Sequence, residues 1–231
     1  MKKKIILKSS ILAVVAGLSV FTINSVFADE LPVQFMGVND FHGALEQTGT
    51  ARLEGETVKN AGTAPLLATY LNDSQKDFET ENAGTPNASI RVQAGDMVGA
   101  SPANSALLQD EPTVKVFNEM NFEYGTLGNH EFDEGLGEFN RIMKGEAPTP
   151  GQFNKIVDEY PHEASKQEVV IANLVDKDTN KIPFDWKPYT IKEIPVNDKT
   201  VKVGFIGVVT TEFPNLVLRK NHEQYRVLDE A

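Results

Sequence analysis

Three short polar clusters carry the residue types that could do chemistry in this chain. The first is Asp40 with His42, the second is Asp96 directly after Gly95, and the third is residues 128–133, which read GNHEFD. Carboxylate oxygens, imidazole nitrogens and amide oxygens are the protein donors that bind zinc, manganese and similar divalent ions. Asp40 and His42 are close enough in one loop for both side chains to reach the same ion. The clusters therefore predict a metal site.

Asp96 stands between the other two clusters in the sequence. Two divalent cations about 4 Å apart repel each other by roughly 17 kcal/mol at an effective dielectric constant near 20. Neutral imidazole and amide ligands do not offset that repulsion, whereas a shared carboxylate does. We therefore expect Asp96 to bridge two ions, and Asn129 to give its amide oxygen to the second ion.

His130 follows Asn129 directly and need not be a metal ligand. Asp133 comes three residues later, at a predicted helix start, where its carboxylate can fix the tautomer of the imidazole. A histidine held in this way suits stabilisation of a transition state or protonation of a leaving oxygen. His130 and Asp133 are therefore the predicted catalytic pair.

Each cluster taken singly has an ordinary structural interpretation as well. An Asp-x-His sequence is common in capped turns, and Gly-Asp is common in turns of every kind. The conjunction of three metal-competent clusters, in order along the chain and each after an apolar stretch, favours a functional site over three unrelated turns.

The chain around the clusters alternates between predicted strands and helices. Apolar periodicity predicts helices over 63–70 and from residue 111 onward. Each cluster follows a predicted strand, and the intervals leave room for helical crossovers, so all three loops can share the rim at the carboxyl ends of the strands. The pattern predicts an α/β fold. Strands are expected at 33–38, 89–94, 122–127, 168–172, 189–196 and 201–209, the last buried on both faces.

Composition excludes several classes of function. The chain has 231 residues, no cysteine and a formal net charge of -11. The lack of cysteine excludes disulfides, thiolate metal sites and a cysteine nucleophile. The negative charge argues against a nonspecific nucleic-acid binder, which needs a cationic surface.

The N-terminus has the layout of a secretory signal peptide. Lys2, Lys3 and Lys4 precede an apolar run over residues 11–21, and Val26-Phe27-Ala28 presents small residues for cleavage. We expect a signal peptide over residues 1–28, a secreted or cell-surface protein, and no stable membrane span in the mature chain. An uncleaved membrane anchor is the alternative, although the apolar run is shorter than the ~20 residues that span a bilayer.

Three longer stretches resemble a known family, namely NDFHG at 39–43, GDMVGASPANSAL at 95–107 and GTLGNHEFDEG at 125–135. They are similar to the secreted bacterial 5'-nucleotidases, which belong to the calcineurin-like metallophosphoesterases. The resemblance covers nearly the whole mature chain and implies a four-layer α/β/β/α sandwich. It also implies a hydrolase that converts nucleotide 5'-phosphate esters into nucleoside and phosphate, without a phosphoenzyme.

The resemblance further implies two divalent metal ions, zinc or manganese, and a nucleotide substrate in place of a nucleic-acid polymer. The same motifs also serve 2',3'-cyclic-nucleotide phosphodiesterases with 3'-nucleotidase activity, and a noncatalytic truncated binding module is a further alternative. The implied roles are Asp40 and His42 for the first metal, Asp96 as the bridge, Asn129 for the second metal, and His130 with Asp133 as the catalytic pair.

One part of the family pattern is not found in this sequence. The family's metal site needs two further histidines, each after a later strand. His162 and His222 stand among polar residues, the former in the polar segment 145–167, and we expect both at the surface. We therefore expect residues 29–231 to be the N-terminal part of the metallophosphoesterase domain, incomplete at its C-terminus, with the C-terminal nucleotide-binding domain absent from this chain.

Overall fold

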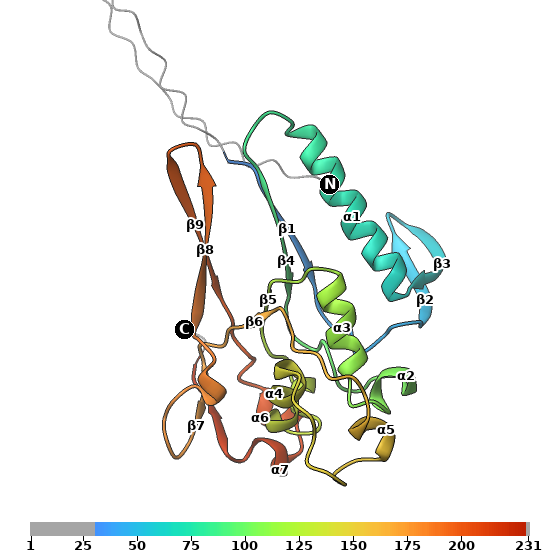
Figure 1. Ribbon diagram of the computed structural model, residues 1–231, viewed down its shortest axis with the longest axis vertical. Helices are drawn as coiled ribbons and strands as arrows, with labels where there is room; N and C mark the ends of the chain where they lie inside the picture. The colour runs from blue at the N-terminus through green and yellow to red at the C-terminus, as the bar shows by residue number, and fades with distance from the viewer. Residues whose placement is uncertain (1–30, 230–231) are drawn as a thin grey trace, which may run out of the picture. The chain divides into compact units, whose positions relative to one another are not determined.

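A four-stranded parallel sheet forms the centre of the fold (Figure 1). The computed structural model describes residues 31–229, so the predicted signal peptide lies outside the described residues. The sheet has the order β1-β4-β5-β6, in which Val33 pairs with Ala88 and Val92 pairs with Tyr124. This parallel sheet, with helices between its strands, confirms the predicted α/β class. The strands are β1 (Val33–Val38), β4 (Ala88–Gln93), β5 (Tyr124–Gly125) and β6 (Glu168–Val169).

Strand β5 is much shorter than the predicted strand 122–127. Beyond Gly125, the N–H of Thr126 still donates to the backbone carbonyl of Gln93 at 3.3 Å. The side chain of Gln93 adds to this link, because its Nε2 donates to the carbonyl of Thr126 at 2.9 Å and its Oε1 accepts the N–H of Gly95 at 2.6 Å. The chain after β5 therefore stays attached to the end of β4.

The helices pack on one face of this sheet around a hydrophobic core. Thr63 begins α1 by accepting the N–H of Leu66 at 3.4 Å, as a helix N-cap does. The ring of Phe117 is buried against Phe122, with centroids 4.5 Å apart. The longer helices are α1 (Ala64–Glu81), α3 (Glu111–Glu119) and α4 (Leu136–Lys144). The short ones are α2 (Ala103–Ala106), α5 (Lys155–Asp158), α6 (Phe213–Leu216), α7 (Arg219–His222) and the 3-10 helices η1 (His130–Phe132) and η2 (Pro183–Asp185).

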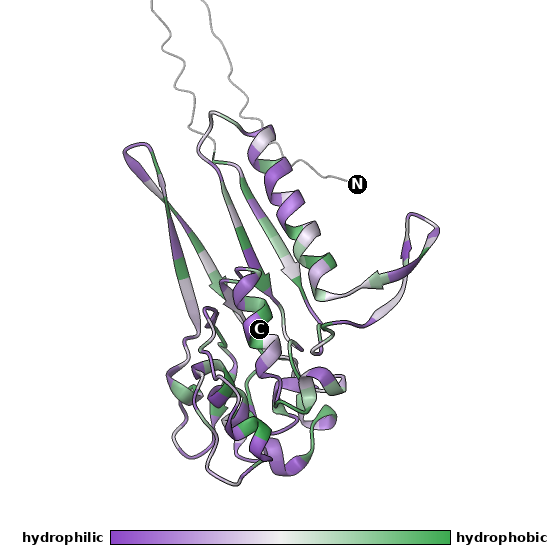
Figure 2. Ribbon diagram, turned by 45° about the vertical axis from the view of Figure 1, so that its right-hand side comes forward, coloured by the Kyte–Doolittle hydropathy of each residue, from purple (hydrophilic) through white to green (hydrophobic). Residues whose placement is uncertain are grey.

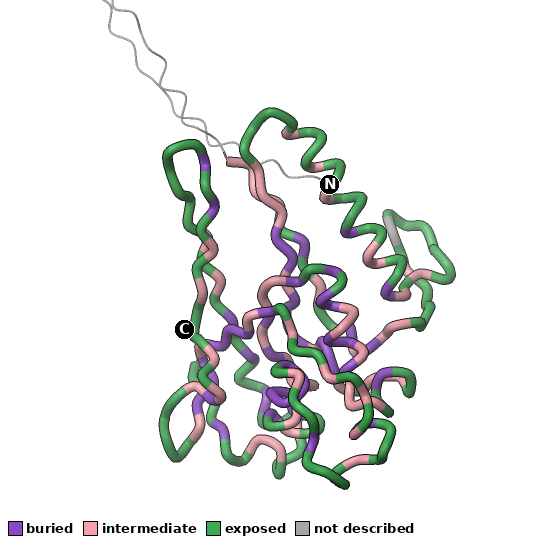
Figure 3. The backbone as a smooth tube through the Cα atoms, viewed as in Figure 1, coloured by how far each residue is buried: buried purple, intermediate pink, exposed green. Residues whose placement is uncertain are grey.

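An antiparallel hairpin, β8 (Tyr189–Val196) with β9 (Lys199–Ile206), covers part of the other face of the sheet (Figure 1). Ile90 of the sheet packs with Ile194 of the hairpin in a second core cluster. Figure 2 shows hydrophobic and hydrophilic residues alternating along the hairpin. The prediction that the last apolar strand is buried on both faces was wrong, because most of β9 is exposed (Figure 3).

Of the four layers implied by the family resemblance, the described residues therefore supply helices, the parallel sheet and this hairpin. Two further antiparallel pairs complete the fold: β2 (Thr48–Leu53) with β3 (Glu56–Gly62), which the sequence did not predict, and β7 (Leu174–Asp176) with β10 (Tyr225–Val227). Among residues 31–229, no helix has the length and apolar character needed to cross a membrane.

The side chain of Asn118 on α3 makes several hydrogen bonds to the polar segment 145–167. The fully buried amide of Asn118 donates to the carbonyl of Ala164 at 2.9 Å and accepts the N–H of Lys166 at 2.7 Å. It also donates to the carboxylate of Glu163 at 2.8 Å. The segment is thus attached to α3 through hydrogen bonds to a buried side chain.

We predict that Asn118→Ala lowers the free energy of unfolding by about 2–4 kcal/mol, because it removes the three hydrogen bonds that a fully buried amide makes to residues 163, 164 and 166. Urea unfolding followed by circular dichroism measures the change. Asn215→Ala is the matched control, since Asn215 is exposed and its amide makes a hydrogen bond of 3.2 Å to Glu212 on the surface. Equal losses in the two variants would contradict the anchoring role.

Candidate metal centre

The loops that follow β1 and β4 stay paired after the strands end. Ala94 donates its N–H to the carbonyl of Val38 at 2.8 Å, Asp40 donates to Gly95 at 3.2 Å, and His42 donates to Asp96 at 3.0 Å. These backbone hydrogen bonds keep the two chain segments paired beyond the sheet, although the register of the strands shifts there. As a result, the first two polar clusters of the sequence lie side by side.

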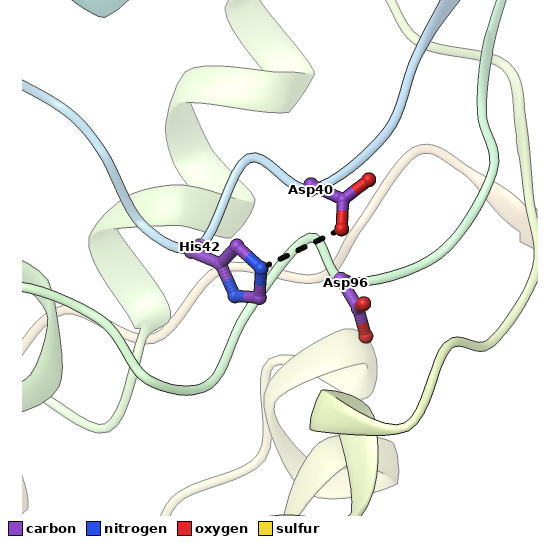
Figure 4. Close-up of side chains that lie close together, drawn as sticks. All are labelled: Asp40, His42 and Asp96. Carbon is purple, nitrogen blue, oxygen red and sulfur yellow. Dashed lines mark ion pairs between the residues drawn. The ribbon is translucent and has the colours of Figure 1, made fainter. Parts of the chain in front are cut away.

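Asp40, His42 and Asp96 converge at this point (Figure 4). Each offers a donor atom, and the three atoms lie within 4.8 Å of one another. The Nε2 atom of His42 is 3.8 Å from Oδ1 of Asp40. Asp40 is exposed, whereas His42 and Asp96 are partly buried, so a cation could enter from the solvent side. Two carboxylates with one imidazole form a donor set that fits a divalent ion.

The same three residues adopt a strained backbone. Their φ angles are 52° for Asp40, 48° for His42 and 52° for Asp96, which is the left-handed region. Non-glycine residues in this region cost of order 1 kcal/mol or more each, although Asp and His tolerate it better than most. The surrounding hydrogen bonds therefore hold the donor residues in conformations that the isolated loops would not favour.

One tautomer of His42 is selected by its neighbour. The Nδ1 atom lies 2.9 Å from the carbonyl oxygen of Gly99, which can only accept a hydrogen bond. Nδ1 must therefore carry the proton, and the lone pair of Nε2 is left for a metal ion.

The third cluster joins the first two through the backbone of His130. Its N–H donates to Oδ1 of Asp96 at 2.8 Å, and its ring meets that of His42 edge-on, with centroids 4.7 Å apart. Asn129, the predicted ligand of a second ion, directly precedes His130 at the start of η1. The structure thus brings all three predicted clusters together.

His130 and Asp133 form the contact that the sequence predicted. Nδ1 of His130 lies 2.9 Å from Oδ2 of Asp133. Partial burial lowers the pKa of His130, but the hydrogen bond to Asp133 and the charges of Asp133, Asp96 and Glu131 outweigh it and raise the pKa above its ordinary value. A cavity of about 110 Å³ opens beside this pair, and Phe139 and Glu134 also line it.

Glu131 is the site residue that sequence reasoning missed. Its carboxylate is buried and accepts the N–H groups of Gly128 at 2.6 Å, Met97 at 2.8 Å and Asp96 at 3.0 Å. It thereby fastens the loop after β4 to the loop after β5. Burial raises the pKa of Glu131 to about 7, against the lowering effect of these backbone donors. The signal in the sequence was a glutamate three residues after Gly128, the spacing with which a capping-box side chain reaches back to the backbone.

Two glycines allow these loops to touch. A Cβ atom on Gly128 would collide with the carboxylate of Asp96, and one on Gly95 would lie 2.6 Å from the backbone nitrogen of Gly128. Only glycine therefore leaves the carboxylate of Asp96 in its place.

The remaining histidines lie away from this cluster. His162 was expected at the surface, but only 13% of its side chain is exposed and its Nδ1 lies 2.6 Å from Oε2 of the buried Glu111. That expectation was wrong, because the partner is distant in sequence. His222 packs its ring against Phe213, with centroids 5.4 Å apart. In the described part of the chain, neither histidine belongs to the group of metal-competent donors.

Most of this chain aligns in sequence with curated relatives. The chain is 53% identical over 205 residues to the cell wall protein Lmo0130 of Listeria monocytogenes, and 36% identical over 205 residues to the endonuclease YhcR of Bacillus subtilis. These matches cover 88% of this chain but 25% and 15% of the two relatives. A 2',3'-cyclic-nucleotide 2'-phosphodiesterase/3'-nucleotidase of Salmonella typhimurium is 32% identical over 133 residues, or 52% of this chain and 17% of the relative. No family model matches the chain.

Solved structures show the same fold. The NAD nucleotidase of Haemophilus influenzae superposes with a TM-score of 0.58 at 24% identity, over 85% of this chain and 29% of that one. The calcineurin-like phosphoesterase YfkN of Bacillus subtilis gives 0.56 at 23% identity, over 85% and 54%. The chain belongs to the calcineurin-like phosphoesterase family. Its relatives in that family include nucleotidases, and calcineurin-like phosphoesterases use divalent metals, which agrees with the donor cluster described above.

We predict that Glu131→Gln loosens both loops of this calcineurin-like phosphoesterase. Whichever way the amide turns, its NH₂ group faces a backbone N–H, so the free energy of unfolding should fall by about 1–3 kcal/mol. Above pH 7 the wild-type carboxylate is ionised, and the comparison is made there. Amide hydrogen exchange should speed up at Asp96, Met97 and Gly128. Glu134→Gln, at an exposed position in the same loop, is the control. Unchanged exchange in Glu131→Gln would refute the fastening role.

Proposed function

We propose that this chain carries the first part of the active site of an exported dinuclear-metal phosphoesterase. Its reaction is hydrolysis of nucleotide 5'-phosphate esters to nucleoside and phosphate. The observation that supports this proposal is the convergence of Asp40, His42 and Asp96 with His130 at the loops after β1, β4 and β5. The chain's likeness to nucleotidases and phosphoesterases also supports hydrolysis at a phosphate ester.

In this proposal the first ion, zinc or manganese, is held by Asp40 and His42, with Asp96 shared between it and a second ion that Asn129 also binds. These donor atoms suit a divalent cation. Asp40 and Asp96 supply negative charge, and the Nε2 lone pair of His42 is free to bind the same ion. When bound, such ions supply an activated water and a positive field for the phosphate.

His130 acts on the substrate and not on the metal. Asp133 occupies Nδ1, so Nε2 is the atom that meets the ester. Because the pKa of His130 is raised, the imidazole keeps a proton that it can share with a phosphoryl oxygen or give to the leaving oxygen.

Two other activities are compatible with the same residues. The Salmonella relative carries the name of a 2',3'-cyclic-nucleotide phosphodiesterase and 3'-nucleotidase, and YhcR carries the name of an endonuclease. The net charge of -11 disfavours a polymeric nucleic acid, so we retain a small nucleotide as the substrate. A noncatalytic module that keeps the fold is the third alternative. For export, the support is the lysine-rich N-terminus together with the Listeria relative's name as a cell wall protein.

We predict that His130→Ala leaves the metal content near wild type while kcat falls about 10²–10⁴-fold, the usual range for a lost acid or oriented donor. Metal analysis and phosphate release are measured on the longest protein that the gene encodes. Asp96→Asn is the contrasting variant, since it removes the shared charge and should lower the number of ions bound. Loss of metal in His130→Ala would make His130 a ligand and contradict the assignment.

We also predict that the 231-residue chain by itself is a poor nucleotidase. In this proposal Asp96 and Asn129 are the only donors that residues 31–229 contribute to the second ion, which is too few for a catalytic ion. Phosphate release with zinc or manganese is compared for this chain and for the longest encoded protein. The substrates are AMP, 3'-AMP, 2',3'-cyclic AMP and single-stranded DNA.

Preferred turnover of AMP by the longer protein supports the proposal, and preferred turnover of either of the other nucleotides supports the cyclic phosphodiesterase. Cleavage of DNA alone would favour a nuclease. Equal turnover of AMP by both proteins would contradict the ligand count, and no turnover by either would favour the noncatalytic module.

A further inference from the structure

One peptide group, that between Gly99 and Ala100, links the predicted metal ligand His42 to Asp133. Its carbonyl oxygen lies 2.9 Å from Nδ1 of His42 and accepts that proton. Its N–H, which belongs to Ala100, donates to Oδ2 of Asp133 at 3.0 Å. Asp133 therefore contacts two systems, His130 directly and His42 through this peptide.

The backbone of Ala100 disfavours the orientation of this peptide. Its φ is 48°, in the left-handed region, where the Cβ atom of an L-residue is crowded. Half a turn of the peptide would bring that angle to about -130°, in the extended region that alanine adopts without strain. Gly99 permits such a turn, because a glycine has no Cβ atom to obstruct it. The orientation in the structure therefore needs support from outside the peptide.

The reversed orientation would move the proton of His42. The carbonyl oxygen of Gly99 would turn away from Nδ1, and the N–H of Ala100 would take its place. Nδ1 would then have to accept a hydrogen bond, so the proton would sit on Nε2. With that proton, Nε2 has no lone pair for a metal ion. The direction of one peptide thus decides whether His42 can bind an ion through Nε2.

The carboxylate of Asp133 favours the observed direction. It accepts the N–H of Ala100, whereas in the reversed peptide it would face a carbonyl oxygen and be repelled by it. The hydroxyl of Ser101 also reaches the carbonyl oxygen of Gly99, but at 3.4 Å it is a weaker restraint.

Asp133 is itself held in place. Its N–H donates to the carbonyl of His130 at 3.1 Å, at the end of η1. Its own carbonyl accepts the side-chain amide of Asn221 on α7 at 2.6 Å. A Cβ atom on Gly99 would lie 2.7 Å from Oδ2, so glycine at that position lets the carboxylate come this near the peptide. The support is thus anchored on η1 and α7, outside the loop that it holds.

We propose that Asp133 is a positioning residue for His42 as well as for His130. By holding the Gly99–Ala100 peptide in its strained orientation, the carboxylate keeps the proton of His42 on Nδ1 and leaves Nε2 for a metal ion. The value of this arrangement for catalysis rests on the proposed function, but the tautomer of His42 can be observed without metal or substrate.

The test compares Asp133→Ala with Asp133→Asn, since both variants remove the charge. Asparagine can place its carbonyl oxygen where Oδ2 stands and accept the N–H groups of Ala100 and His130, whereas alanine accepts neither. Imidazole ¹⁵N shifts are recorded on the metal-free chain, at a pH well above the ordinary imidazole pKa, so that the ring of His42 is neutral. The wild type and Asp133→Asn should show its Nδ1–H form. In Asp133→Ala the ratio of Nε2–H to Nδ1–H should rise about tenfold, the scale of one lost hydrogen bond.

A double variant tests the strain at Ala100. When Ala100→Gly is added to Asp133→Ala, the left-handed conformation is no longer crowded, so the Nδ1–H form of His42 should be partly restored. Glu134→Ala is the matched control, since it removes an exposed carboxylate from the next residue and should leave the spectrum of His42 unchanged. The side chain of Asp133 is 38% exposed, so the variants should fold. If Asp133→Ala does not, Asp133→Leu, apolar and similar in shape to asparagine, gives the same readout.

A second readout separates this proposal from the proposed function. Binding of manganese and of zinc to the chain is measured by isothermal titration calorimetry. The dissociation constants should be about tenfold higher for Asp133→Ala than for Asp133→Asn, within the range for a lost outer-shell partner. Shifted tautomers in a chain whose wild type binds neither metal would support positioning and overturn the metal site of the proposed function. Wild-type tautomers in Asp133→Ala, or equal shifts in Asp133→Ala and Asp133→Asn, would overturn positioning, whatever the metal binding.

Discussion

A buried carboxylate, that of Glu131, is the interaction on which the site depends. Removing a charge from water costs several kcal/mol unless hydrogen-bond donors replace the water. Here three backbone N–H groups do so, from Gly128, Met97 and Asp96. Burial nevertheless raises the pKa to about 7, so the compensation is incomplete. This burial costs free energy, but it holds the loops after β4 and β5 in contact. There, Oδ1 of Asp96 accepts the N–H of His130.

The position of the site follows from how parallel strands end. Backbone hydrogen bonds between the segments of β1 and β4 continue past the sheet to His42 and Asp96, where the donor residues adopt left-handed conformations. The strain is tolerable because hydrogen bonds hold the loops at several points, among them the one between Nδ1 of His42 and the carbonyl oxygen of Gly99. The result is a preorganised arrangement in which imidazole tautomers and carboxylate positions are set before any ion binds.

Electrostatics favour a metal-dependent role for this arrangement. The chain has a net charge of -11, and the cluster itself holds Asp40 and Asp96 beside the buried Glu131. Such a field attracts cations and repels a free phosphate ester at long range. The proposed function therefore requires divalent ions to reverse the local sign before a phosphate ester binds, which fits the metal use of the calcineurin-like phosphoesterases.

The sequence was sufficient to identify residues whose side-chain types indicate metal binding or acid–base chemistry. Asp40, His42 and Asp96 were predictable, because polar residues after apolar strands gather at one rim of a parallel sheet, and the spacing of His130 and Asp133 predicted their contact. It did not find Glu131, whose partners are backbone N–H groups and whose signal in the sequence was its spacing from Gly128.

The sequence also did not reveal contacts between residues far apart in the chain, nor how far a strand is covered by other elements. His162 looked like a surface residue, since its partner Glu111 is 51 positions away. The apolar sequence of β9 suggested burial on both faces, but apolar character does not show how many layers cover a strand. The hairpin of β2 and β3 was missed because its residues carry little apolar periodicity.

The central claim is that Asp40, His42 and Asp96 form a metal site, and anomalous diffraction from crystals soaked in manganese tests it most directly. The account predicts an anomalous peak within bonding distance of oxygens from Asp40 and Asp96 and of Nε2 of His42, and no such peak there in Asp96→Asn. Peaks found only elsewhere, for example against Glu134 in the neighbouring cavity, would contradict it.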